Sequence, residues 1–175
     1  MDVDRSAMIR LFEEIRAAFP HLSMRLDQDP RNVADLNMDI PEQPGLTFDV
    51  NLNLQGDELF LNAGAFCVEW FPCTRPEVVE RYRDAVHGLV SGAYRIRERY
   101  RGARPIRADL QKPSGNRWRT IASWHALPWP FPVRRSERVL QNVSGRSLSL
   151  DRGLQLGRQL LKSDKVRALM DATCG

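Results

Sequence analysis

The chain has 175 residues, 42% of them hydrophobic and 27% charged, with a formal net charge of +4. This length fits one domain with its own core, and the composition is that of a globular protein and excludes a disordered chain. No apolar run approaches the roughly 20 residues of a membrane helix, and the acidic start lacks the basic and apolar segments of an export signal. We therefore expect a cytoplasmic protein, one domain over residues 1–175, with no membrane partner.

The first 20 residues predict an amphipathic helix that begins after Asp4 and ends at Pro20. Its apolar stripe comprises Met8, Leu11, Phe12, Ile15 and Phe19. Residues 22–26 and 36–40 then alternate between apolar and polar side chains, which predicts two strands with one wet face each.

Residues 46–71 predict the clearest hairpin of the chain. Its first strand presents an apolar face made by Leu46, Phe48, Val50, Leu52 and Leu54. Pairing Leu54 with Leu59 sets a register that runs unbroken to Leu46 opposite Cys67, with Gly64 marking a bulge or a bend.

A long helix is predicted next, starting near Pro76 and ending at Gly102, a natural residue for a helix C-terminus. Thr74 and Glu77 have the spacing of a capping box. The apolar positions of this helix are Val78, Tyr82, Val86, Leu89, Ala93, Ile96 and Tyr100.

A second hairpin is predicted around a three-residue loop at residues 113–115, with Gly115 left-handed. This register places Leu110 opposite Trp118 and Asp109 opposite Arg119. Prolines exclude regular structure from residues 127–133, whereas residues 151–172 predict a helix within a peripheral extension at 146–175.

This order of elements lacks the alternation of strand and helix that builds a parallel sheet. We therefore expect an α+β fold: an antiparallel sheet built from hairpins, with the long helix packed on one face and helices at both termini.

Aspartate and asparagine residues alternate on the polar face of the first predicted strands, a set called here the Asp/Asn face. Its members are Asp35, Asn37, Asp39, Asp49, Asn51, Asn53 and Asn62. If Ile40 pairs with Leu46, Asn37 lies opposite Asp49. The same register sets Asp35 opposite Asn51, which faces Asn62 across the hairpin.

Asp and Asn are depleted in strands, so such a face is unusual. It predicts a polar recognition surface, or an oxygen-ligand site for magnesium or calcium. A solvated face that discourages edge-to-edge aggregation is the alternative interpretation.

The charges separate along the chain. Residues 1–74 hold 5 basic and 13 acidic side chains, and residues 75–175 hold 21 basic and 9 acidic ones. Residues 94–138, called here the Arg/Trp region, hold 12 basic and 3 acidic side chains with aromatic residues between them. Arginine among aromatics suits a protein interface, a nucleic-acid interface or a solvated surface. The candidate contact residues are Arg107, Arg117, Trp118, Arg119 and Trp129.

Cys73 is a weak candidate for catalysis, because it precedes a predicted helix N-terminus, a position that lowers a thiol pKa. Its base would be His125 or His87, and no spacing ties either one to Cys73. The three cysteines form no Cys-x-x-Cys pair, and the chain has no zinc, nucleotide or serine-hydrolase fingerprint. We therefore predict a structural Cys73, reduced thiols and no cofactor.

The leading hypothesis is a non-catalytic binding protein that engages a protein partner through the Asp/Asn face and the Arg/Trp region. One alternative is a small hydrolase that uses Cys73 or a metal on the Asp/Asn face. The other is a nucleic-acid-binding module.

Overall fold

The computed structural model describes residues 3–29, 34–126 and 134–142, all within one compact unit, Met1–Asn142. The helices are α1 (Arg5–Ala18) and α2 (Pro76–Val90). The strands are β1 (Arg25–Asp27), β2 (Leu36–Ile40), β3 (Val50–Gln55), β4 (Glu58–Ala63), β5 (Phe66–Trp70), β6 (Arg95–Arg101), β7 (Arg104–Ser114), β8 (Arg117–His125) and β9 (Arg135–Leu140).

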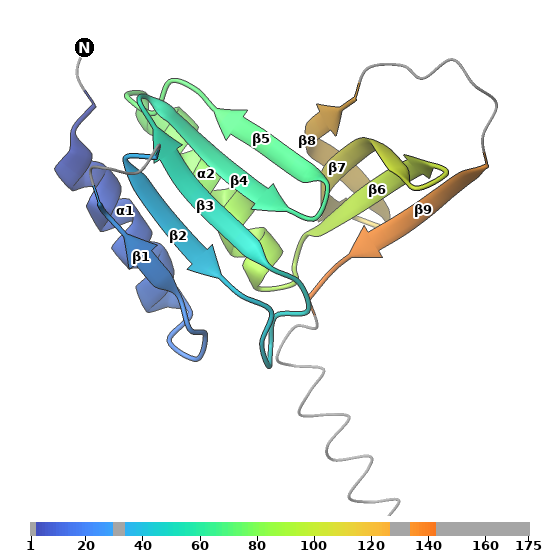
Figure 1. Ribbon diagram of the computed structural model, residues 1–175, viewed down its shortest axis with the longest axis horizontal. Helices are drawn as coiled ribbons and strands as arrows, with labels where there is room; N and C mark the ends of the chain where they lie inside the picture. The colour runs from blue at the N-terminus through green and yellow to red at the C-terminus, as the bar shows by residue number, and fades with distance from the viewer. Residues whose placement is uncertain (1–2, 30–33, 127–133, 143–175) are drawn as a thin grey trace, which may run out of the picture. The chain divides into compact units, whose positions relative to one another are not determined.

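The strands form two antiparallel sheets (Figure 1). One has five strands in the order β1-β2-β3-β4-β5, and the other has four in the order β8-β7-β6-β9. The α+β class is therefore confirmed, with two sheets in place of one. The predicted terminal helix over residues 151–172 lies outside the described residues. Neither described helix has the length and apolar character needed to cross a bilayer.

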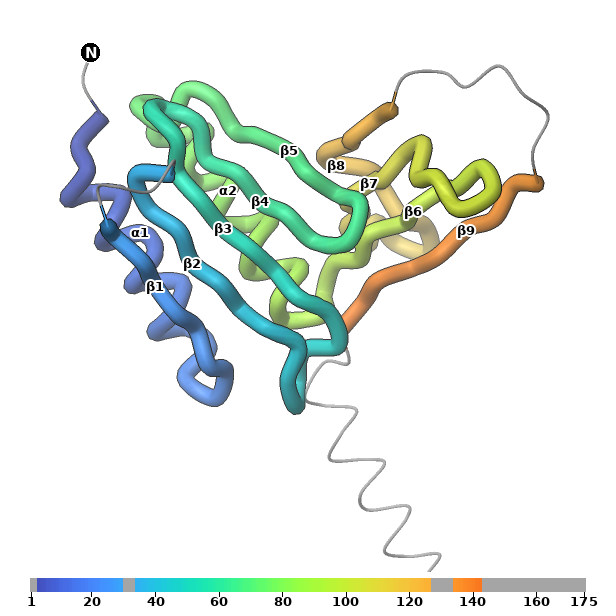
Figure 2. The backbone as a smooth tube through the Cα atoms, viewed as in Figure 1, coloured from blue at the N-terminus to red at the C-terminus, as the bar shows by residue number. Residues whose placement is uncertain are grey.

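The N-terminal helix follows its sequence pattern. Asp4 caps α1 by accepting hydrogen bonds from the backbone amides of Ser6 and Ala7 at 3.0 and 3.2 Å. The predicted stripe is buried in the core, and Phe19 lies at the C-terminal cap. Figure 2 shows α1 and α2 on the same side of the five-stranded sheet, where they cover its apolar face.

The core lies between that face and the two helices. The predicted apolar face is confirmed: Leu46, Phe48, Val50, Leu52 and Leu54 are all buried. Tyr82 of α2 is fully buried, and its hydroxyl donates to the backbone carbonyl of Phe60 at 3.0 Å. This bond satisfies the one polar atom of the Tyr82 side chain, and burial raises the pKa of Tyr82.

The prediction for the first hairpin is confirmed at its turn and wrong at the end far from the turn. Leu54 pairs with Leu59 and Leu52 with Leu61, as expected. The chain then reverses at Gly64, whose φ is 56°, and β5 folds back so that Phe66 lies opposite Ala63. The predicted pairing of Leu46 with Cys67 is therefore wrong, because a glycine in the left-handed region supplies a turn where we expected a bulge or a bend.

The prediction of a long helix from Pro76 to Gly102 is also wrong in its second half. Helix α2 ends at Val90, Gly92 adopts a φ of 80°, and the chain continues as β6 from Arg95. The backbone amide of Tyr94 donates to the Gly88 carbonyl at 2.7 Å, which closes the helix end. At the start, Pro76 occupies the first turn as predicted, but the N-cap is Arg75 without a side-chain bond, so the Thr74 capping box is wrong.

The second hairpin has a different register from the predicted one. Its loop has two residues, with Ser114 paired to Arg117, and the register shifts between Leu110 and Gln111, where Ile121 of β8 is left unpaired. Leu110 therefore lies opposite Ala122 and Asp109 opposite Ser123, not opposite Trp118 and Arg119. The left-handed Gly115, with a φ of 59°, is confirmed.

Two buried polar side chains connect distant segments. Glu98 of β6 accepts a hydrogen bond from the Ala65 amide at 2.6 Å and another from the Tyr100 hydroxyl at 2.7 Å. Asn142 accepts from the Thr47 amide at 2.8 Å and donates to two carbonyls at the end of α2. Both residues are almost completely buried, so these bonds hold the Gly64 turn and the α2 terminus in place.

Candidate functional site

The Asp/Asn face forms with a register four residues away from the expected one. Ile40 pairs with Val50, which sets Asp39 opposite Asn51. The predicted pairing of Ile40 with Leu46 is wrong because residues 41–49 form a long connection, in which Leu46 instead bridges to Gln43. Asn62 lies opposite Asn51 as predicted.

Asn51 is the centre of a network of side-chain amides. Its Nδ2 donates to Asn37 Oδ1 and to Asp39 Oδ1, both at 2.8 Å. Its Oδ1 accepts from the amides of Asn53 and Asn62 at 3.0 and 3.1 Å. These four bonds use the full hydrogen-bonding capacity of the Asn51 side chain.

Asp39 is the charged member of this network. Burial would raise the pKa of its carboxyl, but hydrogen bonds from Arg25, Asn51 and Asn37 outweigh burial and lower the pKa below its ordinary value. The carboxylate therefore stays ionised, with Arg25 Nη2 at 3.0 Å from Oδ2.

The two remaining predicted aspartates serve local backbone structure. Asp35 accepts from the Gly56 amide at 2.8 Å, and Asp49 accepts from the Glu42 amide at 2.6 Å. An open pocket of about 380 Å³ is lined in part by Asp39, Asp49 and Asn62. Over the part of the chain that the structure describes, no group of three or more histidine, cysteine or acidic residues is placed to hold a metal ion. The Asp/Asn face is thus a polar surface whose side chains bond to one another.

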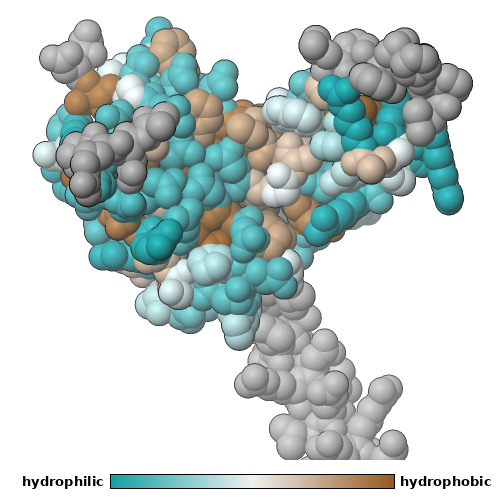
Figure 3. Space-filling view, viewed as in Figure 1, coloured by the Kyte–Doolittle hydropathy of each residue, from teal (hydrophilic) through white to brown (hydrophobic). Residues whose placement is uncertain are grey.

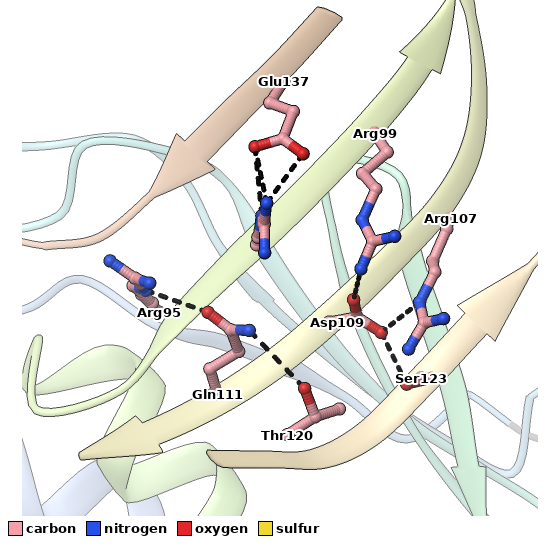
Figure 4. A network of polar contacts seen from close by, with 9 residues as sticks. Arg95, Arg99, Arg107, Asp109, Gln111, Thr120, Ser123 and Glu137 are labelled. Atoms are coloured by element: carbon pink, nitrogen blue, oxygen red, sulfur yellow. Dashed lines mark hydrogen bonds and ion pairs between the residues drawn. The ribbon is translucent and has the colours of Figure 1, made fainter. Parts of the chain in front are cut away.

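The outer face of the four-stranded sheet is made by alternate residues of β6 to β9 and carries a second polar network (Figure 4). Asp109 lies at its centre with 1% of its side chain exposed. It accepts from Ser123 Oγ at 2.6 Å, from Arg107 Nε at 2.7 Å and from Arg99 Nη2 at 3.2 Å. Burial would raise the Asp109 pKa, but these hydrogen bonds and the two guanidinium charges lower it.

Other arginines of this face are also held in place. Arg97 binds Glu137 with two guanidinium nitrogens, at distances of 2.7 to 3.1 Å. Arg95 donates to Gln111 at 3.0 Å and lies over the Trp118 ring, 4.1 Å from its centroid. Stacking of this kind covers one face of the indole.

Six arginines lie close together where β6 pairs with β7 and β9. They are called here the arginine cluster: Arg99, Arg101, Arg104, Arg107, Arg134 and Arg135. Arg101 lies opposite Arg104 in β7 and opposite Arg135 in β9, and Arg99 lies opposite Arg107. The Gly102 amide donates to the Arg134 carbonyl at 2.8 Å, which adds a sixth arginine to the same end of the sheet. Like charges at opposed positions destabilise a sheet, so these arginine pairs do not contribute to the stability of the fold.

The predicted contact residues of the Arg/Trp region do not form one site. Arg107 and Trp118 lie on the outer face, whereas Arg119 alternates to the opposite face, where it pairs with Lys112. Arg117 is exposed beside the hairpin loop. Trp129 lies outside the described residues.

The surroundings of Cys73 are unfavourable for a nucleophile. Its side chain is buried, and burial together with the nearby Asp57 charge raises the pKa of its thiol. His125, its proposed base, is exposed at the end of β8 and pairs with Arg107. A buried thiol with a raised pKa is poor in thiolate at neutral pH, so the geometry favours the structural role.

Sequence patterns missed a pocket of about 420 Å³ that lies between α2, β5 and the β7–β8 hairpin. Trp70, Arg81, Lys112 and Arg119 contribute to its lining. These residues come from four elements, and the sequence offered no signal that would bring them together. Comparisons of the chain with protein-family models, with curated proteins and with solved structures found no match.

Proposed function

We propose that the protein is a non-catalytic, cytoplasmic binding protein that holds an acidic protein partner against the arginine cluster and the outer face of the four-stranded sheet. The observation that carries this proposal is the excess of positive charge in the Arg/Trp region. Residues 94–138 contain 12 basic side chains and 3 acidic ones. Each of those acids, Glu98, Asp109 and Glu137, is already bonded within the protein.

The composition of this surface suits a protein partner better than a nucleic acid. Arginine is among the residues enriched at protein interfaces, and Val139 adds an aliphatic side chain that is 48% exposed. A single-stranded nucleic acid needs open aromatic rings for its bases to stack on, and Arg95 already covers one face of the Trp118 ring. In the space-filling view, strongly hydrophilic side chains stand out at the end of the four-stranded sheet (Figure 3).

The test is the anisotropy of labelled poly-L-glutamate, compared with labelled single- and double-stranded DNA, at low salt. A variant with Arg104, Arg134 and Arg135 changed to Gln should bind poly-L-glutamate about 10-fold more weakly, at about 0.5 kcal/mol for each exposed charge contact. The matched control loses the same charge from outside the Arg/Trp region: R10Q, R16Q and R75Q together.

The control variant should bind as tightly as the unmodified protein. Equal weakening in both variants would show that only net charge matters and would refute a site at the arginine cluster. Tighter binding of DNA than of poly-L-glutamate, lost in the cluster variant, would establish the nucleic-acid alternative instead.

A further inference from the structure

The pocket between α2, β5 and the β7–β8 hairpin has the features of a ligand site. Its volume of about 420 Å³ falls within the range of small-molecule sites. Its lining consists of Trp70, Arg81, Asp84, Ala85, Lys112, Arg119, Thr120 and Ile121. Lys112 and Arg119 face away from the arginine network of the outer face, because they alternate with Gln111 and Thr120 along their strands.

The pocket is cationic, and its single acid is already engaged. Both carboxylate oxygens of Asp84 accept from the Tyr94 hydroxyl, at 2.8 and 2.9 Å, and Lys112 Nζ lies 3.8 Å from the same group. Burial, followed by the hydrogen bond to Asp84, raises the pKa of Tyr94 to about 12, so this tyrosine remains a donor. Asp84 is therefore occupied from within the protein.

The two arginines of the pocket lack a comparable partner. Arg81 donates from Nε to the Glu77 carbonyl of its own helix at 3.3 Å. Within residues 3–29, 34–126 and 134–142, neither Arg81 nor Arg119 forms an ion pair with a carboxylate. Arg81 of α2 and Arg119 of β8 both line the pocket, so their guanidinium groups are available to bind an anion there.

Three of the remaining lining residues, Trp70, Ala85 and Ile121, are apolar. The Trp70 ring packs edge-on against the buried Tyr82, with 5.5 Å between ring centroids and an interplanar angle of 73°. Ala85 and Ile121 extend this apolar wall. An apolar wall with a few charged groups is the usual makeup of a site for a small organic molecule.

We propose that this pocket binds a small organic anion, in which a carboxylate, sulfonate or phosphate group is attached to an apolar body. The anionic group lies between Arg81 and Arg119, and the apolar body lies against Trp70. This site is separate from the arginine cluster, so it does not depend on the proposed protein partner.

The probe for the test is 1-anilinonaphthalene-8-sulfonate, a fluorescent aromatic sulfonate of this class, titrated into the full chain. We expect saturable binding at one site. A variant that combines Arg81→Gln with Arg119→Gln should bind the dye at least about 10-fold more weakly, the loss expected when charged hydrogen bonds are removed. The control is Arg117→Gln, an exposed arginine of the same strand outside the pocket lining, which should leave the affinity unchanged.

The dye also brightens on partly unfolded protein, so each variant is first matched to the parent by near-ultraviolet circular dichroism. A further variant, Arg81→Lys with Arg119→Lys, keeps both charges and should retain most of the affinity. Binding that never saturates, or binding of equal strength to the Gln and parent proteins, would overturn the proposal. Neither result depends on poly-L-glutamate binding at the arginine cluster.

Discussion

Replacing Asp109 with Asn should destabilise the protein far more than its position on a polar sheet face suggests. The side chain is 1% exposed and accepts three hydrogen bonds, two of them from guanidinium groups. Removing one member of a buried ion pair costs about 3–5 kcal/mol. Arg99 and Arg107 keep 37% and 35% of their side chains exposed, so water can solvate them, and we expect a loss of about 2 kcal/mol.

The measurement is urea denaturation of the parent protein and two variants, followed by circular dichroism. Glu137→Gln is the matched control, because Glu137 also binds an arginine on the same sheet face but is 49% exposed. Its loss should cost no more than about 0.5 kcal/mol. The two variants remove the same charge, so the difference between them measures the effect of burial.

The stabilisation by Asp109 should also depend on pH. Its folded-state pKa is lowered, so its stabilising effect is fully present above the unfolded-state pKa and is lost as the pH falls through the folded-state pKa. The difference between parent and Asp109→Asn should therefore stay constant from about pH 5 to about pH 8 and shrink below about pH 4. A variant as stable as Glu137→Gln, or a difference that grows in acid, would refute this account of the outer face.

Three further outcomes follow from the contacts of single residues. Gly64→Ala should cost about 2 kcal/mol in urea denaturation, because a Cβ at a φ of 56° would also collide with the Glu98 carboxylate. Asn142→Ala should cost about 2 kcal/mol by the same assay, since it leaves two buried carbonyls and the Thr47 amide without their partner. Iodoacetamide at neutral pH should modify exposed Cys67 well before buried Cys73, and the reverse order would revive Cys73 as a nucleophile.

Local patterns predicted the elements whose folding depends on neighbours in the sequence. The stripe of α1 and the apolar face around Leu52 each repeat with one clear period, and both are buried as expected. The turn between Leu54 and Leu59 also formed in the predicted register. Each of these features is fixed by residues fewer than about 15 positions apart.

One error, the length of the second helix, arose where two periods were both compatible with the sequence. The long helix was extended through residues 91–101 because Ala93, Ile96 and Tyr100 continue a helical spacing. Arg95, Arg97, Arg99 and Arg101 alternate with a period of two, which is the signature of a strand. Gly92 marks the change between the two, and its φ of 80° ends the helix.

The sites were harder to predict than the elements, because each depends on contacts across elements. Asn51 and Asn62 could be paired from the hairpin alone, but the partner of Asp39 depended on the length of the connection at residues 41–49. In the sequence, Glu98 is one more charged residue in a polar segment. In the structure it is fully buried and accepts a hydrogen bond from the distant Ala65 amide. No spacing within β6 carries that information.

The alternation of one basic hairpin gives the protein two different cationic surfaces. In β7 and β8, Arg107 faces Asp109 and the outer network, while Lys112 and Arg119 face α2 and the apolar wall at Trp70. The register shift leaves Ile121 of β8 unpaired, so Ser123 and Thr120 lie on the outer face and Arg119 lies on the opposite one. Charge on the outer face meets solvent and is open to a large acidic surface. Charge on the inner face borders the pocket of about 420 Å³, so the two proposed ligands would contact opposite faces of this hairpin.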